Sequence, residues 1–144
     1  PECFPDPLEA ACRFANDALF HIPVRTLCRA RSGGRSYLYS FRIPSGKPGV
    51  RACHAVELSY LFGTSRYGYG GKNMDMAVSR RLQELWISFA RGGVPAAEGI
   101  SWGEYACGRE LVIDPGGFRE EKAEPVPEGL KDLAFIPVLD AGLF

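Results

Sequence analysis

Two histidines are the first candidates for chemistry in this chain. His21 and His54 are the only residues of their type, and histidine is the usual proton carrier of enzymes because its side chain ionises near neutral pH. His54 follows a predicted strand and a glycine-containing loop and precedes a predicted helix, which is where α/β enzymes place catalytic groups. We interpret His54 as a candidate general base. The spacing alone leaves a purely structural histidine open as the alternative, and for His21 we expect a packing or capping role.

Other side chains near His54 allow weaker hypotheses. Glu57 lies three residues further along a predicted helix, within reach of His54, and either orients the imidazole or makes a structural hydrogen bond. Cys53 is adjacent to His54, but adjacent side chains point apart, which argues against a Cys–His nucleophile pair. Tyr67 and Tyr69, in a glycine-rich segment, are candidates for a place near substrate. The five cysteines form no Cys-x-x-Cys pair, so we expect no zinc or other metal site and no cofactor.

Composition sets the broad class. The chain has 144 residues, the ordinary size of one domain, and we expect a single unit over residues 1–144. Lys plus Arg and Asp plus Glu number 17 each. This balance lacks the basic excess typical of proteins that bind nucleic acid. No apolar run reaches the length of about 18–20 residues that a membrane span needs.

The elements that must position these residues alternate between helix and strand. A helix begins at the Asp6 cap with Pro7 in its first position, and a second helix is predicted to begin at Pro23, with Val24 and Leu27 facing inward. Residues 36–43 form a strand with Tyr37, Tyr39, Phe41 and Ile43 on one face. Leu38 on the other face indicates a parallel sheet covered on both sides.

The second half of the chain repeats this alternation. Helices are predicted over 56–62 and 75–91, the latter with an apolar stripe that includes Trp86 and Phe89 as core residues. A loop anchored by Trp102 leads to a short strand over 110–114 and a turn over 114–117. The segment beyond Phe118 is charged and rich in proline, and no element is predicted there. The pattern favours the α/β class.

Several of these segments match one known family in order. Residues 54–63 read His-Ala-Val-Glu-Leu-Ser-Tyr-Leu-Phe-Gly, which resembles the histidine motif of the type B carboxylesterases, the cholinesterase-like branch of the α/β-hydrolases. Residues 17–23 are similar to that family's Asp-x-x-Phe-x-x-Pro segment, and 37–41 to its Tyr-x-Tyr-x-Phe strand. Residues 86–95 resemble its Trp-x-x-Phe-Ala-x-x-Gly-x-Pro helix, and Trp102 with Tyr105 and residues 111–114 match its closing pieces.

The resemblance implies an incomplete enzyme. In this family a Ser, an acid and a His form the catalytic triad in that chain order, and His54 corresponds to the histidine. Residues 1–144 then correspond to the C-terminal part of an α/β-hydrolase. We identified no Gly-x-Ser-x-Gly nucleophile elbow, and the family's acid precedes the histidine by more than the available length. Glu9 lies in no matching motif. The chain alone is therefore expected to be inactive, and small esters would bind only with the rest of the enzyme.

Two further hypotheses follow. Cholinesterase-like folds include members that resemble adhesion proteins and have lost catalysis, so a non-catalytic interaction module is the alternative function. The strand over 37–43 is also predicted to have a neighbouring strand along each edge, and an exposed strand edge can pair with another chain. We therefore predict self-association, or association with an N-terminal esterase partner.

Overall fold

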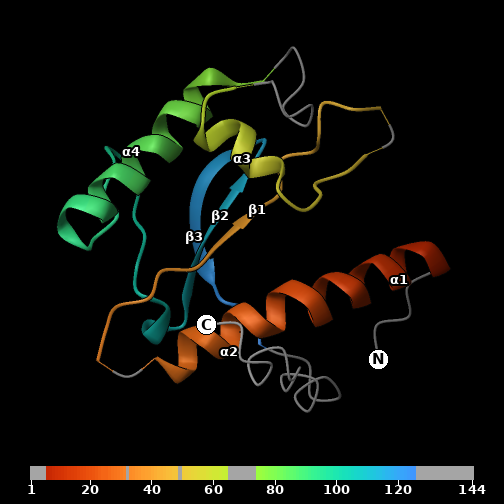
Figure 1. Ribbon diagram of the computed structural model, residues 1–144, viewed down its shortest axis with the longest axis horizontal. Coiled ribbons are helices and arrows are strands. Elements are labelled where there is room, and N and C mark those ends of the chain that lie inside the picture. Colours follow the sequence, from red (N-terminus) through yellow and green to blue (C-terminus); the bar gives the residue numbers. More distant parts are fainter. Residues whose placement is uncertain (1–5, 32, 49, 65–73, 126–144) are drawn as a thin grey trace, which may run out of the picture. The chain divides into compact units, whose positions relative to one another are not determined.

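The computed structural model describes residues 6–31, 33–48, 50–64 and 74–125 (Figure 1). The chain divides into two compact units, one formed by Pro1–Gly34 with Glu124–Phe144 and the other by Arg35–Ala123. That residues 1–144 fold as a single unit stays a prediction. In the described ranges no helix has both the length and the apolar character to cross a membrane.

The first unit contains one continuous helical rod of three segments: α1 (Pro7–Asn16), the π-helical turn η1 (Asp17–His21) and α2 (Ile22–Ala30). Asp6 caps α1 as predicted, its carboxylate accepting from the N–H of Leu8 at 2.9 Å. The prediction that a separate helix begins at Pro23 is wrong, because Ile22 keeps right-handed helical geometry. A proline removes an N–H and its ring crowds the preceding turn. The wider π turn directly before Pro23 accommodates both effects without ending the helix.

The apolar side chains of α2 also differ from the prediction. Val24 is 43% exposed and Leu27 is 65% exposed, although both were expected to face inward. Ile22 and Arg25 are the buried residues of this helix. The buried face of α2 therefore runs through Ile22 and Arg25 and does not include Val24 and Leu27.

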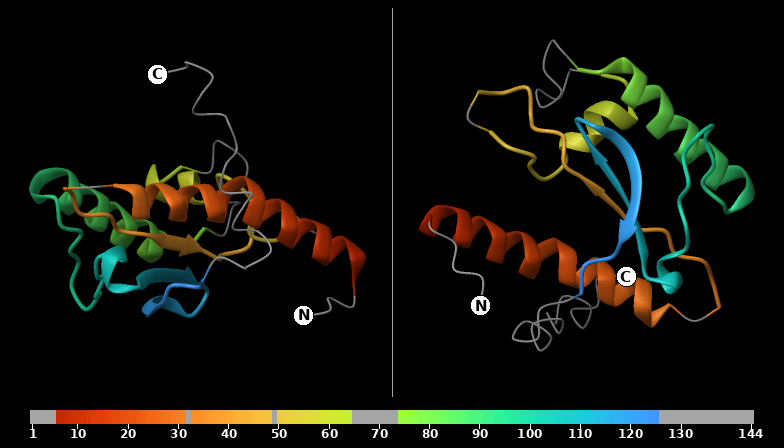
Figure 2. Two further views of the ribbon diagram at one scale, coloured as in Figure 1. Left: turned by 90° about the horizontal axis from the view of Figure 1, so that it is seen from below. Right: turned by 180° about the vertical axis from the view of Figure 1, so that it is seen from behind.

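The second unit is built on a three-stranded sheet with the order β1-β2-β3 (Figures 1 and 2). β1 (Tyr39–Phe41) runs parallel to β2 (Arg109–Asp114), with Tyr39 beside Leu111. The predicted strand over 36–43 is thus confirmed with a shorter regular part. The parallel pairing is confirmed as well, within a sheet that is mixed, because β3 is antiparallel to β2.

β3 (Gly117–Lys122) was not predicted. Its residues 119–122 read Arg-Glu-Glu-Lys, a run without the β-branched and aromatic residues that favour strands. The predicted turn over 114–117 forms, with the carboxylate of Asp114 accepting from the N–H of Gly116 at 2.8 Å. The turn folds the charged segment back along β2. An edge strand tolerates such charges, which discourage pairing with other chains.

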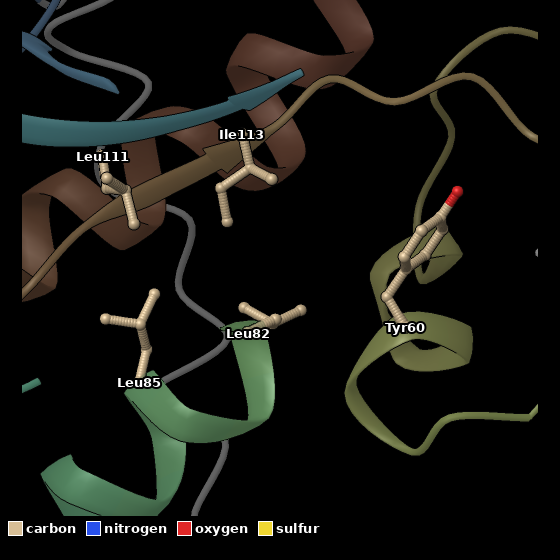
Figure 3. Packing of buried hydrophobic residues seen from close by; sticks show 5 residues of the cluster. All are labelled: Tyr60, Leu82, Leu85, Leu111 and Ile113. Atoms are coloured by element: carbon tan, nitrogen blue, oxygen red, sulfur yellow. The ribbon is translucent and has the colours of Figure 1, made fainter. Parts of the chain in front are cut away.

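Two helices cover one face of this sheet: α3 (Val56–Leu61) and α4 (Met76–Gly92). Leu82 and Leu85 of α4 and Tyr60 of α3 pack with Leu111 and Ile113 of β2, and all five are buried. Figure 3 shows the two strand side chains pointing toward the two leucines. Alternation along β2 places Glu110 and Val112 on the opposite face, where both are also buried.

Helix α4 follows its predicted limits closely. Asp75 caps it, accepting from the N–H of Ala77 at 2.8 Å, and Gly93 ends it in the left-handed conformation with φ 71°. The prediction that Trp86 and Phe89 are core residues is wrong, since they are 41% and 40% exposed. They lie at the margin of the core, where the Trp86 ring meets the edge of Tyr39 with centroids 6.4 Å apart.

Candidate active site

His54 lies in a tight turn between the loop after β1 and helix α3. The N–H of Val56 donates to the carbonyl of Cys53 at 3.2 Å, closing a four-residue turn in which His54 is second and Ala55 is third. Ala55 has φ 67° and ψ 9°. These angles are typical of the third residue of a type II turn, where glycine is usual. His54 itself is exposed.

The turn holds a strained residue directly after His54. Among the residues that the structure describes, Ala55 is the one non-glycine residue with a positive φ. A side chain in this conformation costs roughly 1–2 kcal/mol. Such residues persist only where the surrounding structure enforces them, and they concentrate at functional sites. The neighbouring packing must therefore hold Ala55 in place.

Helix α3 supplies that restraint because α4 holds its final turn. The hydroxyl of Ser79 donates to the carbonyl of Tyr60 at 2.6 Å, and the side-chain amide of Gln83 donates to the carbonyl of Leu61 at 3.0 Å. Carbonyls in the last turn of a helix lack full intrahelical partners. These two contacts supply them from a neighbouring helix, and they fix α3 and the turn before it on α4.

The end of α3 shows why a glycine closes the motif. The N–H of Thr64 donates to the carbonyl of Ser59 at 2.9 Å and that of Gly63 to the carbonyl of Tyr60 at 3.3 Å, the two hydrogen bonds of a Schellman motif. Gly63 has φ 61°, and a Cβ there would lie 3.1 Å from the amide nitrogen of Gln83. A side chain at position 63 would therefore be strained by this conformation, and the Gln83 amide would have to shift to make room for it.

The site lies beyond the carboxyl end of β1. Figure 1 shows α3 beside the ends of β1 and β2, and the rings of Phe41 in β1 and Tyr60 in α3 are 5.1 Å apart between centroids. This edge of a parallel pair is where α/β folds place ligands. His54 thus follows β1 and directly precedes α3, as its position in the sequence predicts, and its catalytic role stays a prediction.

Glu57 lies close enough to Tyr39 in β1 for its charge to affect the phenol. Burial, and after it the negative charge of Glu57, raise the pKa of Tyr39 to about 12, against the opposing effect of a hydrogen bond with Trp86. The Glu57 carboxylate is therefore close enough to affect the Tyr39 phenol. This coupling between α3 and β1 was missed, since only the three-dimensional structure brings residues 39 and 57 together. That Glu57 orients His54 stays a prediction.

With this geometry described, the comparison with known proteins is informative. The profile of the Carboxylesterase family matches residues 6–122. The chain belongs to the carboxylesterase family. The match contains every motif on which the sequence resemblance was based, so the predicted family is confirmed.

Relatives of this carboxylesterase chain come from bacteria and mammals. It is 30% identical over 114 residues to the para-nitrobenzyl esterase of Bacillus subtilis (strain 168), covering 72% of the chain and 23% of that relative. It is 31% identical over 98 residues to carboxylesterase 1C of Mus musculus, covering 62% of the chain and 18% of that relative. The chain thus spans about a fifth of the length of the curated relatives it matches.

Solved structures confirm the fold class. A PNB esterase superimposes with a TM-score of 0.64 over 91% of this chain and 28% of its own, at 24% identity. The thermophilic PNB esterase gives a TM-score of 0.54 at the same identity. The mixed sheet with its covering helices is accordingly part of an α/β-hydrolase fold.

The prediction that the chain lacks a Gly-x-Ser-x-Gly pattern is wrong. The pattern Gly-x-Ser-x-Gly does occur, at residues 99–103, with Ser101 in its centre. A nucleophile elbow places its serine on a sharp turn between a strand and a helix. Ser101 instead lies in an irregular loop between the isolated bridge Ala97–Ile100 and a short 3-10 turn, η2 (Tyr105–Cys107). It also follows His54, whereas the family's serine comes first. Residues 99–103 therefore match the sequence pattern of a nucleophile elbow but do not form its strand–turn–helix structure.

The other histidine, His21, belongs to the helical rod of the first unit. The Nδ1 atom of His21 lies 2.9 Å from the carboxylate of Asp17 within the helical rod, a structural contact. Tyr67 and Tyr69 lie outside the described residues. In the part of the chain that the structure describes, no group of three or more His, Cys, Asp or Glu side chains is arranged to hold a metal ion.

Substituting Ala55 by glycine tests the strained turn. We expect Ala55→Gly to raise the free energy of unfolding by about 0.5–1 kcal/mol, because relief of the left-handed strain outweighs the added flexibility of the unfolded chain. Urea unfolding of purified protein measures this. The matched control is Ala90→Gly in helix α4, which should lower stability by about 1 kcal/mol. If both variants lowered the free energy of unfolding by the same amount, that result would contradict a positive φ at Ala55.

Removing the charge of Glu57 tests its coupling to Tyr39. We expect Glu57→Gln to lower the pKa of the Tyr39 phenol, since loss of a nearby negative charge favours tyrosinate. Ultraviolet titration of tyrosinate, with Tyr39→Phe to assign the late-ionising group, measures it. The raised pKa means that Tyr39 contributes stability that is present below the ordinary value of 10.0 and is lost as pH rises through about 12. An identical titration of Glu57→Gln and the exposed-site control Glu84→Gln would contradict the coupling.

Proposed function

We propose that this chain supplies the catalytic histidine of a serine ester hydrolase, with His54 as general base and then general acid. The observation that carries the proposal is the position of His54. The residue is exposed, it lies beyond the carboxyl end of β1, and it occupies a strained turn that α3 and α4 hold. Family membership supports the same role, because the matched region includes the histidine motif.

In this proposal His54 first accepts a proton and then donates it. A ring nitrogen of the neutral imidazole accepts the hydroxyl proton as a serine oxygen attacks the ester carbonyl. The same nitrogen then donates that proton to the leaving alcohol as the carbonyl–oxygen bond breaks. The second ring nitrogen donates to the triad acid, which fixes the tautomer. Water repeats the sequence on the acyl-enzyme, with His54 again taking and returning the proton.

The serine and the acid lie outside the 144 residues in this proposal. Ser101, the one serine in an elbow-like string, lies in an irregular loop. The chain corresponds to about a fifth of its relatives, so there is ample sequence in a complete esterase for both groups. The substrate class is small carboxylic esters, bound only when the rest of the domain is present. In this proposal the rest of that domain, and not the turn around His54, selects the acyl and alcohol groups of the ester.

The isolated chain is expected to hydrolyse no ester above background. Loss of the nucleophile from a serine hydrolase triad costs about a million-fold in rate, which places residual turnover below detection. The measurement is the release of p-nitrophenol from p-nitrophenyl acetate by purified chain, beside His54→Ala and Ser101→Ala. Turnover that either substitution abolishes would contradict the division of the triad described above.

A chimera tests the role of His54 directly. Residues 39–93 of this chain, from β1 to the residue that ends α4, would replace the matching segment of the Bacillus subtilis para-nitrobenzyl esterase, so that Ser79 and Gln83 still hold α3. We expect a folded chimera to hydrolyse p-nitrophenyl acetate and His54→Ala to lower kcat by several powers of ten with little change in KM, because a proton carrier acts on the reacting atoms.

Two controls make this result specific. Glu57→Gln in the same chimera should retain most of the activity if its role is confined to Tyr39. Circular dichroism and unfolding of the His54→Ala chimera should match those of its parent, because His54 is exposed. A folded, active chimera whose kcat is unchanged by His54→Ala would overturn the proposal.

A further inference from the structure

The carbonyl of Tyr60 in the last turn of α3 accepts two hydrogen bonds of different length. The N–H of Gly63 donates to it at 3.3 Å, and the hydroxyl of Ser79 in α4 donates to it at 2.6 Å. The next carbonyl, that of Leu61, accepts from the side-chain amide of Gln83 at 3.0 Å. The shortest of these contacts, and therefore the one that most tightly determines where α3 ends, comes from Ser79.

Ser79 and Gln83 differ in their exposure to solvent. Ser79 is fully buried and Tyr60 is 4% exposed, whereas Gln83 is half-buried. Water can take the place of the Gln83 amide at a half-buried position. Between two buried residues it has no such access, and a buried carbonyl that loses a donor is unfavourable. Removal of the Ser79 hydroxyl is therefore expected to displace α3.

The contact at Ser79 reaches His54 through a short path. α3 begins at Val56 and has six residues, so Tyr60 lies about one helical turn from its first residue. The N–H of Val56 donates to the carbonyl of Cys53 at 3.2 Å and closes the turn that contains His54. A helix this short has no length over which to absorb a displacement. A shift of its last turn therefore also shifts its first turn and His54.

We propose that Ser79 is a positioning residue for His54. Its hydroxyl acts through α3 and not on the reacting atoms: it fixes α3, and α3 fixes the turn that directs the imidazole. This inference rests on the proposed function, because Ser79 has a part in the reaction only if His54 carries the proton. The strain at Ala55 agrees with it, since a residue with a positive φ persists only where its surroundings enforce it.

The experiment uses the chimeric esterase that carries residues 39–93 of this chain. We expect Ser79→Ala to lower kcat for p-nitrophenyl acetate about tenfold with little change in KM, because a small misplacement of a catalytic group slows the reaction without weakening substrate binding. Ser79→Cys fills the same space with a much weaker donor, so it should lower kcat in the same direction. This second variant keeps the test decisive if Ser79→Ala does not fold.

The matched control is another serine of the same helix. The hydroxyl of Ser88 donates to the carbonyl of Leu85 at 2.9 Å and accepts from the N–H of Ala96 at 2.7 Å, and both partners lie outside α3. Ser88→Ala also removes a hydroxyl from α4, and we expect it to leave kcat unchanged. Circular dichroism and urea unfolding of each variant show that the compared proteins are folded.

A double substitution separates positioning from general support of the fold. In the His54→Ala chimera, with residual turnover measured at high enzyme concentration, Ser79→Ala should lower the rate no further, because the group that it positions is gone. A serine that only supports the fold would lower the rate by the same factor whether or not His54 is present.

Two results would overturn this inference alone, given that His54→Ala lowers kcat as proposed. One is a kcat for the folded Ser79 variants equal to that of Ser88→Ala. The other is an equal loss from Ser79→Ala with and without His54. A kcat that His54→Ala leaves unchanged would instead overturn the proposed function and, with it, the role of Ser79.

Discussion

The conformation of Ala55 is the constraint on which the candidate site depends. An alanine at φ 67° is held against its own preference, and what holds it is the short helix that begins at the next residue. α3 has only six residues, too few to be stable alone. It persists because Ser79 and Gln83 of α4 bind its last carbonyls and because Tyr60 packs in the core. The placement of His54 is therefore a consequence of how α4 packs on the sheet.

The same packing links the turn that contains His54 to β1 through aromatic residues. Tyr39 meets Trp86 and Trp102 edge to face, and its phenol is affected by the charge of Glu57. Trp102 also donates from its indole nitrogen to the carbonyl of Leu38 at 3.0 Å, which ties the loop after α4 to the start of β1. These rings connect α4 and the loop that follows it to one short strand.

The sequence predicted the elements whose signals are local. The α4 limits follow from Asp75 and Gly93, and the β1 face from aromatic alternation. β3 was missed because its charged residues suit an edge and give no strand signal. The π turn was missed because Pro23 normally marks a helix start, and Trp86 was misplaced because periodicity does not show how wide the buried face is. Residues 99–103 match the nucleophile-elbow pattern in sequence only, and the structure shows that they form an irregular loop. The turn at Ala55 carries no glycine, so nothing in the sequence marked its positive φ.

The most direct measurement of the central claim is a crystal structure of the chimeric para-nitrobenzyl esterase, carrying residues 39–93 of this chain, after reaction with a phosphonate that labels the nucleophilic serine. The account predicts a positive φ at Ala55 and a ring nitrogen of His54 at hydrogen-bond distance, about 2.6–3.2 Å, from the serine oxygen. A labelled serine whose neighbour is any other base, with the His54 ring turned to solvent, would contradict it.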